Sequence, residues 1–117
     1  MTEKELVEYI QHRLDEIIDV IERAIENGDG DFETNCLYKY LIMQCNSTKS
    51  FVGIASTRPW RKKDLCRIYH LIYNSMLSID LLFEYEKDNF GYYEYTDLDE
   101  LLTDCMQTLS GQMLLTQ

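Results

Sequence analysis

The stretch that decides the fold runs from Leu65 to Phe83 and reads LCRIYHLIYNSMLSIDLLF. Its apolar residues recur every three or four positions, which is the spacing of one face of an α-helix. That face holds Leu65, Tyr69, Ile72, Met76, Ile79 and Phe83, and Ile68, Leu71, Leu77 and Leu82 extend the apolar character around the same helix. Because this segment is apolar on most sides, we expect it to be the central helix of the fold.

Polar residues interrupt this stretch on several sides, at Arg67, His70, Asn74 and Asp80. Such interruptions are typical of a buried core helix and not of a membrane span. We therefore expect His70 to be a satisfied core residue. The first residues, Met1 to Glu5, show no cationic region followed by an apolar one, so the sequence predicts no secretory signal and a cytoplasmic protein.

Two further helices are predicted before this one. The first spans Glu3 to Asn27, with Thr2 and Glu5 in the spacing of a capping box. Its apolar stripe consists of Val7, Ile10, Leu14, Ile17, Ile21 and Ala24. The second spans Phe32 to about Gln44, although Tyr38 to Met43 could also form a strand. One side of this second helix carries Leu37, Tyr40, Leu41 and Cys45. Residues 46–57 either extend it or form an ordered loop.

The helix that contains Leu65 is predicted to run from Trp60 to about Lys87, with Pro59 in its first turn and Ser56 or Thr57 as its cap. A last helix is predicted from Asp97 to about Gln112, with Thr96 and Asp99 at its start. Its core side consists of Leu98, Leu101, Leu102, Cys105, Met106 and Leu109. The predicted fold is all-α: a single-domain bundle of about four helices over residues 1–117.

The formal charge of the chain is -10, from 21 acidic and 11 basic residues. This balance argues against a general basic surface for nucleic acid or anionic lipid. The charge is also uneven along the chain. Residues 1–33 carry 11 acidic and 3 basic residues (-8), residues 34–79 carry 1 and 7 (+6), and residues 80–117 carry 9 and 1 (-8).

Both acidic blocks contain candidate partner-binding residues. In the first helix, Glu8, Asp15 and Glu22 repeat every seven positions, and Asp19 and Glu26 do so on the adjoining track. The second block mixes acidic residues with tyrosines: Glu84, Glu86, Asp88, Tyr92, Tyr93, Glu94, Tyr95, Asp97, Asp99 and Glu100. Tyrosines give rigid contact area, and carboxylates pair with arginine and lysine of a partner. The alternatives are a solvated helix face and aromatic residues that plug the bundle end.

One basic cluster lies beside Trp60 and consists of Arg58, Arg61, Lys62, Lys63 and Arg67. A basic patch next to an aromatic residue can bind phosphate or nucleic acid. In so acidic a chain, we favour a contact between this cluster and the first helix, either within one chain or in a homodimer.

Residues that could support catalysis or metal binding give weak signals. The four cysteines form no Cys-x-x-Cys pair, so we expect free, mostly buried thiols. His12 lies near Glu8 and Asp15, but two histidines are too few for a di-iron bundle site. Acidic pairs such as Glu100 and Asp104 could hold Mg²⁺, yet they occur in any acidic helix. The prediction is a protein without enzymatic activity, metal or cofactor.

The sequence thus favours a non-enzymatic inhibitor that occupies the basic, nucleic-acid-binding surface of a partner protein by mimicking nucleic acid, without binding nucleic acid or membrane itself. In size and charge the chain resembles the small acidic anti-CRISPR and anti-restriction inhibitors of phages and mobile elements, a resemblance of composition. The alternative is a self-associating structural or regulatory adaptor in which the acidic and basic segments meet between protomers. A metal-dependent hydrolase is a third, weaker hypothesis.

Overall fold

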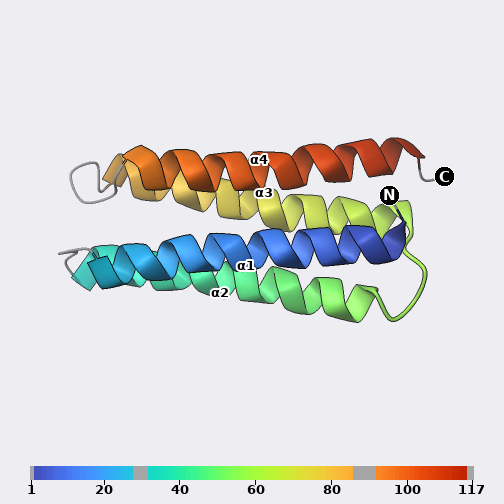
Figure 1. Ribbon diagram of the computed structural model, residues 1–117, viewed down its shortest axis with the longest axis horizontal. Coiled ribbons are helices and arrows are strands. Elements are labelled where there is room, and N and C mark those ends of the chain that lie inside the picture. Colours follow the sequence, from blue (N-terminus) through green and yellow to red (C-terminus); the bar gives the residue numbers. More distant parts are fainter. Residues whose placement is uncertain (1, 28–31, 86–91, 116–117) are drawn as a thin grey trace.

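The computed structural model of the chain is a bundle of four helices about 47 Å long (Figure 1). It describes residues 2–27, 32–85 and 92–115. The helices are α1 (Glu3–Asn27), α2 (Phe32–Ala55), α3 (Lys62–Tyr85) and α4 (Tyr92–Leu115). The predicted all-α four-helix bundle is confirmed.

Consecutive helices run antiparallel and pack side by side, and α1 also packs against α4 (Figure 1). Among the described residues, no Cα atoms of the diagonal pairs α1 with α3 and α2 with α4 lie within 8 Å of each other. Each helix therefore occupies one corner of a square. The expectation of a central third helix is wrong, because α3 has two neighbouring helices, as each of the others has, and keeps an exposed outer side.

The core is formed by the inward stripe of each helix. Its fully buried members include Leu6, Ile10, Leu14, Ile17, Ile21, Leu41, Leu65, Ile68, Ile72, Ile79 and Leu82. On α4 the buried positions are Leu98, Leu102, Cys105 and Leu109, as the spacing predicts. Two buried hydroxyl groups are satisfied locally: Thr48 donates to the Gln44 carbonyl at 3.0 Å, and Ser75 to the Leu71 carbonyl at 3.3 Å.

Three residues assigned to the core from sequence lie instead on the outside. Tyr40 is 50% exposed and Leu77 49% exposed, and His70 is also exposed. A helix at a corner buries only the stripe that faces its two neighbours, so apolar residues on its far side stay in solvent. On α2, Tyr38 is buried where the prediction had placed Tyr40.

The start of α1 confirms the predicted capping box. The Thr2 hydroxyl accepts the Glu5 backbone N–H at 3.2 Å, and the Thr2 N–H donates to Glu5 Oε1 at 3.3 Å. The Thr2 hydroxyl also donates to Glu5 Oε1 at 2.9 Å, and this bond, together with that of the Thr2 N–H, lowers the pKa of the Glu5 carboxyl. The pair satisfies backbone donors that the first turn of a helix leaves open.

Residues 46–57, for which the sequence allowed either a helix or an ordered loop, extend α2 as far as Ala55. Within them, Val52 and Ala55 are buried. Ser56 and Thr57 do not cap α3, contrary to expectation. Their hydroxyls donate to the carbonyl oxygens of Gly53 and Ile54, each at 2.8 Å, and so close the end of α2.

Helix α3 begins at Lys62, later than predicted, because Asp64 provides its cap from inside the first turn. Asp64 Oδ2 accepts the Arg61 backbone N–H at 2.8 Å, and the Arg58 guanidinium donates two bonds of 2.8 Å to the same carboxylate. The Asp64 side chain is buried, and these donors hold its pKa well below the ordinary 3.8. Pro59 lies in the loop before the helix.

Helix α4 begins at Tyr92, earlier than the predicted Asp97. Thr96 and Asp99 therefore lie inside the helix and do not mark its start. The tyrosine-rich segment, which the sequence had placed in a connection, forms the first turn of α4.

Replacement of Asp64 by alanine is expected to destabilise the bundle by about 2 kcal/mol, because it removes a helix cap and a bidentate charged hydrogen bond together. Urea unfolding followed by circular dichroism measures this loss. Arg58→Ala is the matched control: it leaves the Arg61 N–H bonded to Asp64 and should destabilise less.

The same site predicts a pH dependence. Because the folded-state pKa of Asp64 is lowered, its stabilising effect is present above pH 3.8 and is lost as the pH falls below that value. The free-energy difference between wild type and Asp64→Asn should therefore shrink on acidification. A difference that stays constant from pH 7 to pH 3 would contradict the assignment of this carboxylate as ionised.

The four cysteines are free, as predicted, but only two of them are buried. Burial raises the pKa of Cys45 and of Cys105 to about 12, whereas Cys36 and Cys66 are exposed. Thiolates are the reactive form. A thiol reagent such as DTNB should therefore label two cysteines rapidly in the native protein and all four after unfolding. A Cys36→Ser, Cys66→Ser variant should show no rapid phase.

Candidate functional site

The acidic groove lies between α1 and α4 and has a volume of about 410 Å³. Because these two helices are neighbours, the first and last acidic blocks of the sequence share one side of the bundle. The groove is lined by Glu16, Asp19, Asp97, Glu100 and Asp104, by Arg13 and Arg23, and by Val20 and Leu101. Five carboxylates against two guanidinium groups leave it with a formal charge of -3.

Both arginines of the groove are paired with carboxylates of α1. Arg23 lies 3.0 Å from Asp19, and Arg13 lies 3.4 Å from Glu16 and over the ring of Tyr9, at 5.2 Å from its centroid. On the α4 side, Asp97 and Glu100 form no ion pair with any residue in the described ranges. We call these two residues, Asp97 and Glu100, the α4 wall of the groove. Their carboxylates are available to an external cation.

The predicted partner-binding residues of α1 separate onto two sides. Asp19 lines the acidic groove, but Asp15 forms an ion pair with Lys49 of α2, on the opposite flank. Glu8 lines a different hollow of about 360 Å³, together with Trp60. Glu22 and Glu26 are exposed and lie outside the groove lining.

The predicted residues of the second block separate in a similar way. Asp97 and Glu100 lie in the groove, whereas Asp99 is half-buried outside it and Glu84 is exposed on α3. Asp99 follows Asp97 by two positions, a spacing that turns it to another side of the helix. Outside the described residues lie Glu86 and Asp88, and the side chains of Tyr92, Tyr93, Glu94 and Tyr95.

Glu16 and Asp104 complete the groove, but the predicted partner-binding residues include neither. Sequence reasoning missed Glu16 entirely and considered Asp104 only with Glu100, as a possible Mg²⁺ pair. Both carry a signal in the sequence. Glu16 precedes Asp19 by three positions, and Asp104 follows Glu100 by four, so each pair lies on one helix face. Grouping acidic residues at spacings of three and four, in place of seven, would have placed both among the partner-binding candidates.

The basic cluster does not contact α1 through its charges. Arg58 is bound to Asp64, while Arg61, Lys62, Lys63 and Arg67 are exposed and form no ion pair with a described residue. The contact to α1 comes from the backbone: the Trp60 N–H donates to Glu3 Oε1 at 3.0 Å. The predicted pairing of this cluster with the first helix is therefore not present within the chain. The cluster lies at the end of the bundle where α1 begins (Figure 1).

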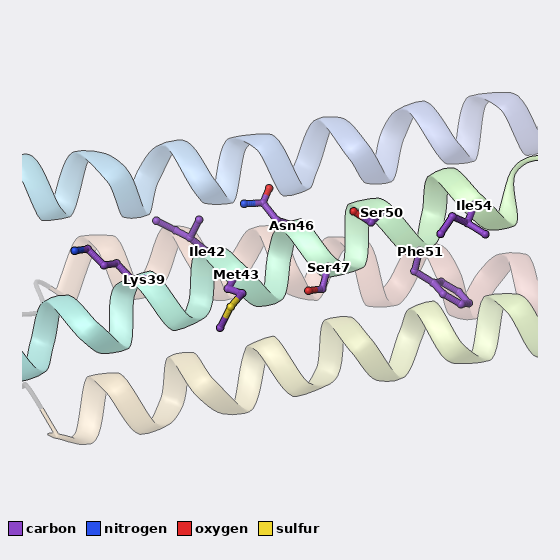
Figure 2. A pocket seen from close by; sticks show the side chains of 8 residues that line it. All are labelled: Lys39, Ile42, Met43, Asn46, Ser47, Ser50, Phe51 and Ile54. Carbon is purple, nitrogen blue, oxygen red and sulfur yellow. The ribbon is translucent and has the colours of Figure 1, made fainter.

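The outer side of α2 has a different character (Figure 2). A shallow hollow of about 660 Å³ there is lined only by residues of this helix, and Lys39 is its single charged residue. Met43 is 58% exposed and Ile54 71% exposed. Side chains that are small or apolar, among them Ser47 and Ser50, make up most of this surface.

The neighbouring outer side of α3 also exposes apolar side chains, Leu77 and Leu81, among polar ones such as Arg67 and Asn74. A narrower hollow of about 280 Å³ joins the two helices and is lined by Met43 and Tyr40 of α2 and by Leu71 and Asn74 of α3, among others. We call the exposed apolar residues on the side that these two helices share the α2/α3 face: Tyr40, Met43, Ile54, Leu77 and Leu81. The bundle thus has an acidic side and, opposite to it, a side that exposes several large apolar residues.

Within residues 2–27, 32–85 and 92–115, no group of three or more histidine, cysteine or acidic side chains is placed to hold a metal ion. His12, the metal candidate of α1, is instead 2.9 Å from Glu16. None of the four helices, over the same ranges, has both the length and the apolar character to cross a bilayer.

Comparison with protein-family models, with curated proteins and with solved structures gave no match for this chain.

Proposed function

We propose that the chain is a non-enzymatic acidic binding protein that places its α1/α4 side on a basic, nucleic-acid-binding surface of a partner protein and so excludes nucleic acid. The observation that supports this most directly is the acidic groove, in which carboxylates from both acidic blocks meet. Had α4 packed elsewhere, the two blocks would have faced different directions.

The charge distribution suits such a role. Helix α4 has five acidic residues and no lysine or arginine in its 24 positions. The chain as a whole has a formal charge of -10. The α1/α4 side therefore presents a negative field that accelerates encounter with a basic surface and repels nucleic acid. Exposed carboxylates bound by arginine and lysine then replace the phosphates that such a surface normally contacts.

The small acidic inhibitors that phages and mobile elements direct against CRISPR and restriction enzymes are the class that this proposal favours. Their targets hold nucleic acid in basic channels, which an acidic helical surface can occupy. In this proposal the enzyme's nucleic-acid site is blocked by occupancy, so the chain requires no catalytic residue of its own.

Neutralisation of the α4 wall tests the proposal. The variant Asp97→Asn, Glu100→Gln removes two carboxylates from the groove, while Asn46→Lys, Ser50→Lys adds two positive charges on exposed positions of α2. Both variants have the same net charge and differ only in where it is altered. The measurement is affinity capture of nucleic-acid-binding proteins from lysate, followed by titration of the captured protein.

Wild type and the α2 variant should capture the same proteins and release them with heparin or salt, whereas the groove variant should bind about tenfold more weakly or worse, with a shallower salt dependence. If both variants lost the same affinity for the captured protein, the effect would come from net charge in general, and a role for the groove would be refuted. Unchanged binding by the groove variant would refute it as well.

Self-association through opposite charges is the second candidate, and it has one observation in its favour: Arg61, Lys62, Lys63 and Arg67 are exposed without an ion pair among the described residues. Such an adaptor would form larger species at low salt and dissociate at high salt. Light scattering over a range of ionic strength distinguishes it, since a monomer at every salt concentration excludes it.

A further inference from the structure

We infer that the α2/α3 face binds a second copy of this chain, as a twofold-symmetric antiparallel dimer. Several large apolar side chains exposed together on one side of a soluble protein mark an interaction surface. Five large apolar side chains of the α2/α3 face are between 49% and 71% exposed on two adjacent helices, and a hollow connects these helices. This inference is independent of the proposed function, because it involves the opposite side of the bundle.

Charge argues for a second copy on this side. The chain repels its own copy at the acidic side, where α1 and α4 meet. Helix α2, by contrast, contains one acidic and two basic residues, and α3 contains three of each. Two copies can therefore approach through the α2/α3 face without net repulsion, while their acidic sides point away from each other.

The dimensions of the bundle are sufficient for such an interface. A side 47 Å long and 18 to 22 Å wide covers roughly 800 to 1,000 Å². Stable interfaces of standard size bury about 800 Å² per partner. One side of the bundle thus provides the area that a stable dimer needs.

The charges along α3 define the orientation. Its exposed end residues have opposite signs: Lys63 lies 11 positions before Asn74, and Glu84 lies 10 positions after it. At 1.5 Å per residue, each is roughly 15 Å from Asn74. A twofold axis at Asn74 that pairs α3 with an antiparallel α3 of the second copy therefore brings each Lys63 next to a Glu84. An isologous interface makes this contact twice.

The same axis also suits α2. Met43 and Asn74 line one hollow, so they lie at the same level along the bundle. An axis through that level pairs α2 with its own copy and places the two exposed Met43 side chains side by side. Apolar contacts at the centre and ion pairs toward the ends follow the usual organisation of protein interfaces.

Sedimentation equilibrium of the full chain over a concentration range tests the dimer. The expected mass is twice 13.9 kDa. Leu77→Glu and Leu81→Glu should each raise the dissociation constant at least tenfold, because they place a buried carboxylate in the interface. Both residues are exposed in the single chain, so circular dichroism should remain unchanged. Leu115→Glu, at an exposed apolar position of α4, is the matched control and should leave the dimer intact.

A charge exchange tests the orientation. Lys63→Glu alone and Glu84→Lys alone should each weaken the dimer several-fold, and the double variant should restore it. Failure of the double variant to recover would overturn the antiparallel register. A monomer at all concentrations, or a dimer that tolerates Leu77→Glu, would overturn the interface itself.

Partner binding through the acidic groove and dimerisation through the α2/α3 face can be refuted independently of each other. The groove variant Asp97→Asn, Glu100→Gln should leave the dimer unchanged, because neither residue belongs to the α2/α3 face. Loss of the dimer in that variant would overturn the assignment of the interface to α2 and α3. Loss of partner capture with an intact dimer bears only on the acidic groove.

Discussion

The packing of α1 against α4 is the contact on which the rest of the structure depends. Each helix has one narrow apolar stripe, and antiparallel neighbours joined in chain order bury three of the four sides of a square. The fourth side closes only when the first helix meets the last. Since the acidic residues are concentrated at the two ends of the chain, this closure brings like charges together and leaves the less charged middle of the chain on the opposite side.

The fold class was predictable because helical periodicity is strong in this sequence. The helix limits were less so, and the reasons are local. Residues 46–57 contain serine, threonine and glycine, which have weak helix preference, yet burial of Val52 and Ala55 extends α2 through them. The start of α3 was misplaced because the capping carboxylate, Asp64, reaches backward from within the helix. A search for a preceding serine or threonine does not find it.

The candidate site was predictable only in part. The spacing of acidic residues shows which ones share a helix face, but it does not show which neighbouring helix that face meets. Asp15 and Asp19 differ by four positions, and nevertheless one pairs with Lys49 of α2 while the other lines the groove with α4. Tyr40 and Leu77 illustrate the same limit in the core. Their outward position depends on the arrangement of all four helices, which a single stripe does not specify.

The acidic groove also has a consequence for folding itself. Five carboxylates against two arginines across one helix pair oppose the closure of the bundle, so dissolved cations that screen this repulsion stabilise the seam. Ligands that bind only the folded state raise its stability. A basic partner that occupies the groove would therefore act as a counterion for the protein's own fold, and the chain would be most rigid when bound.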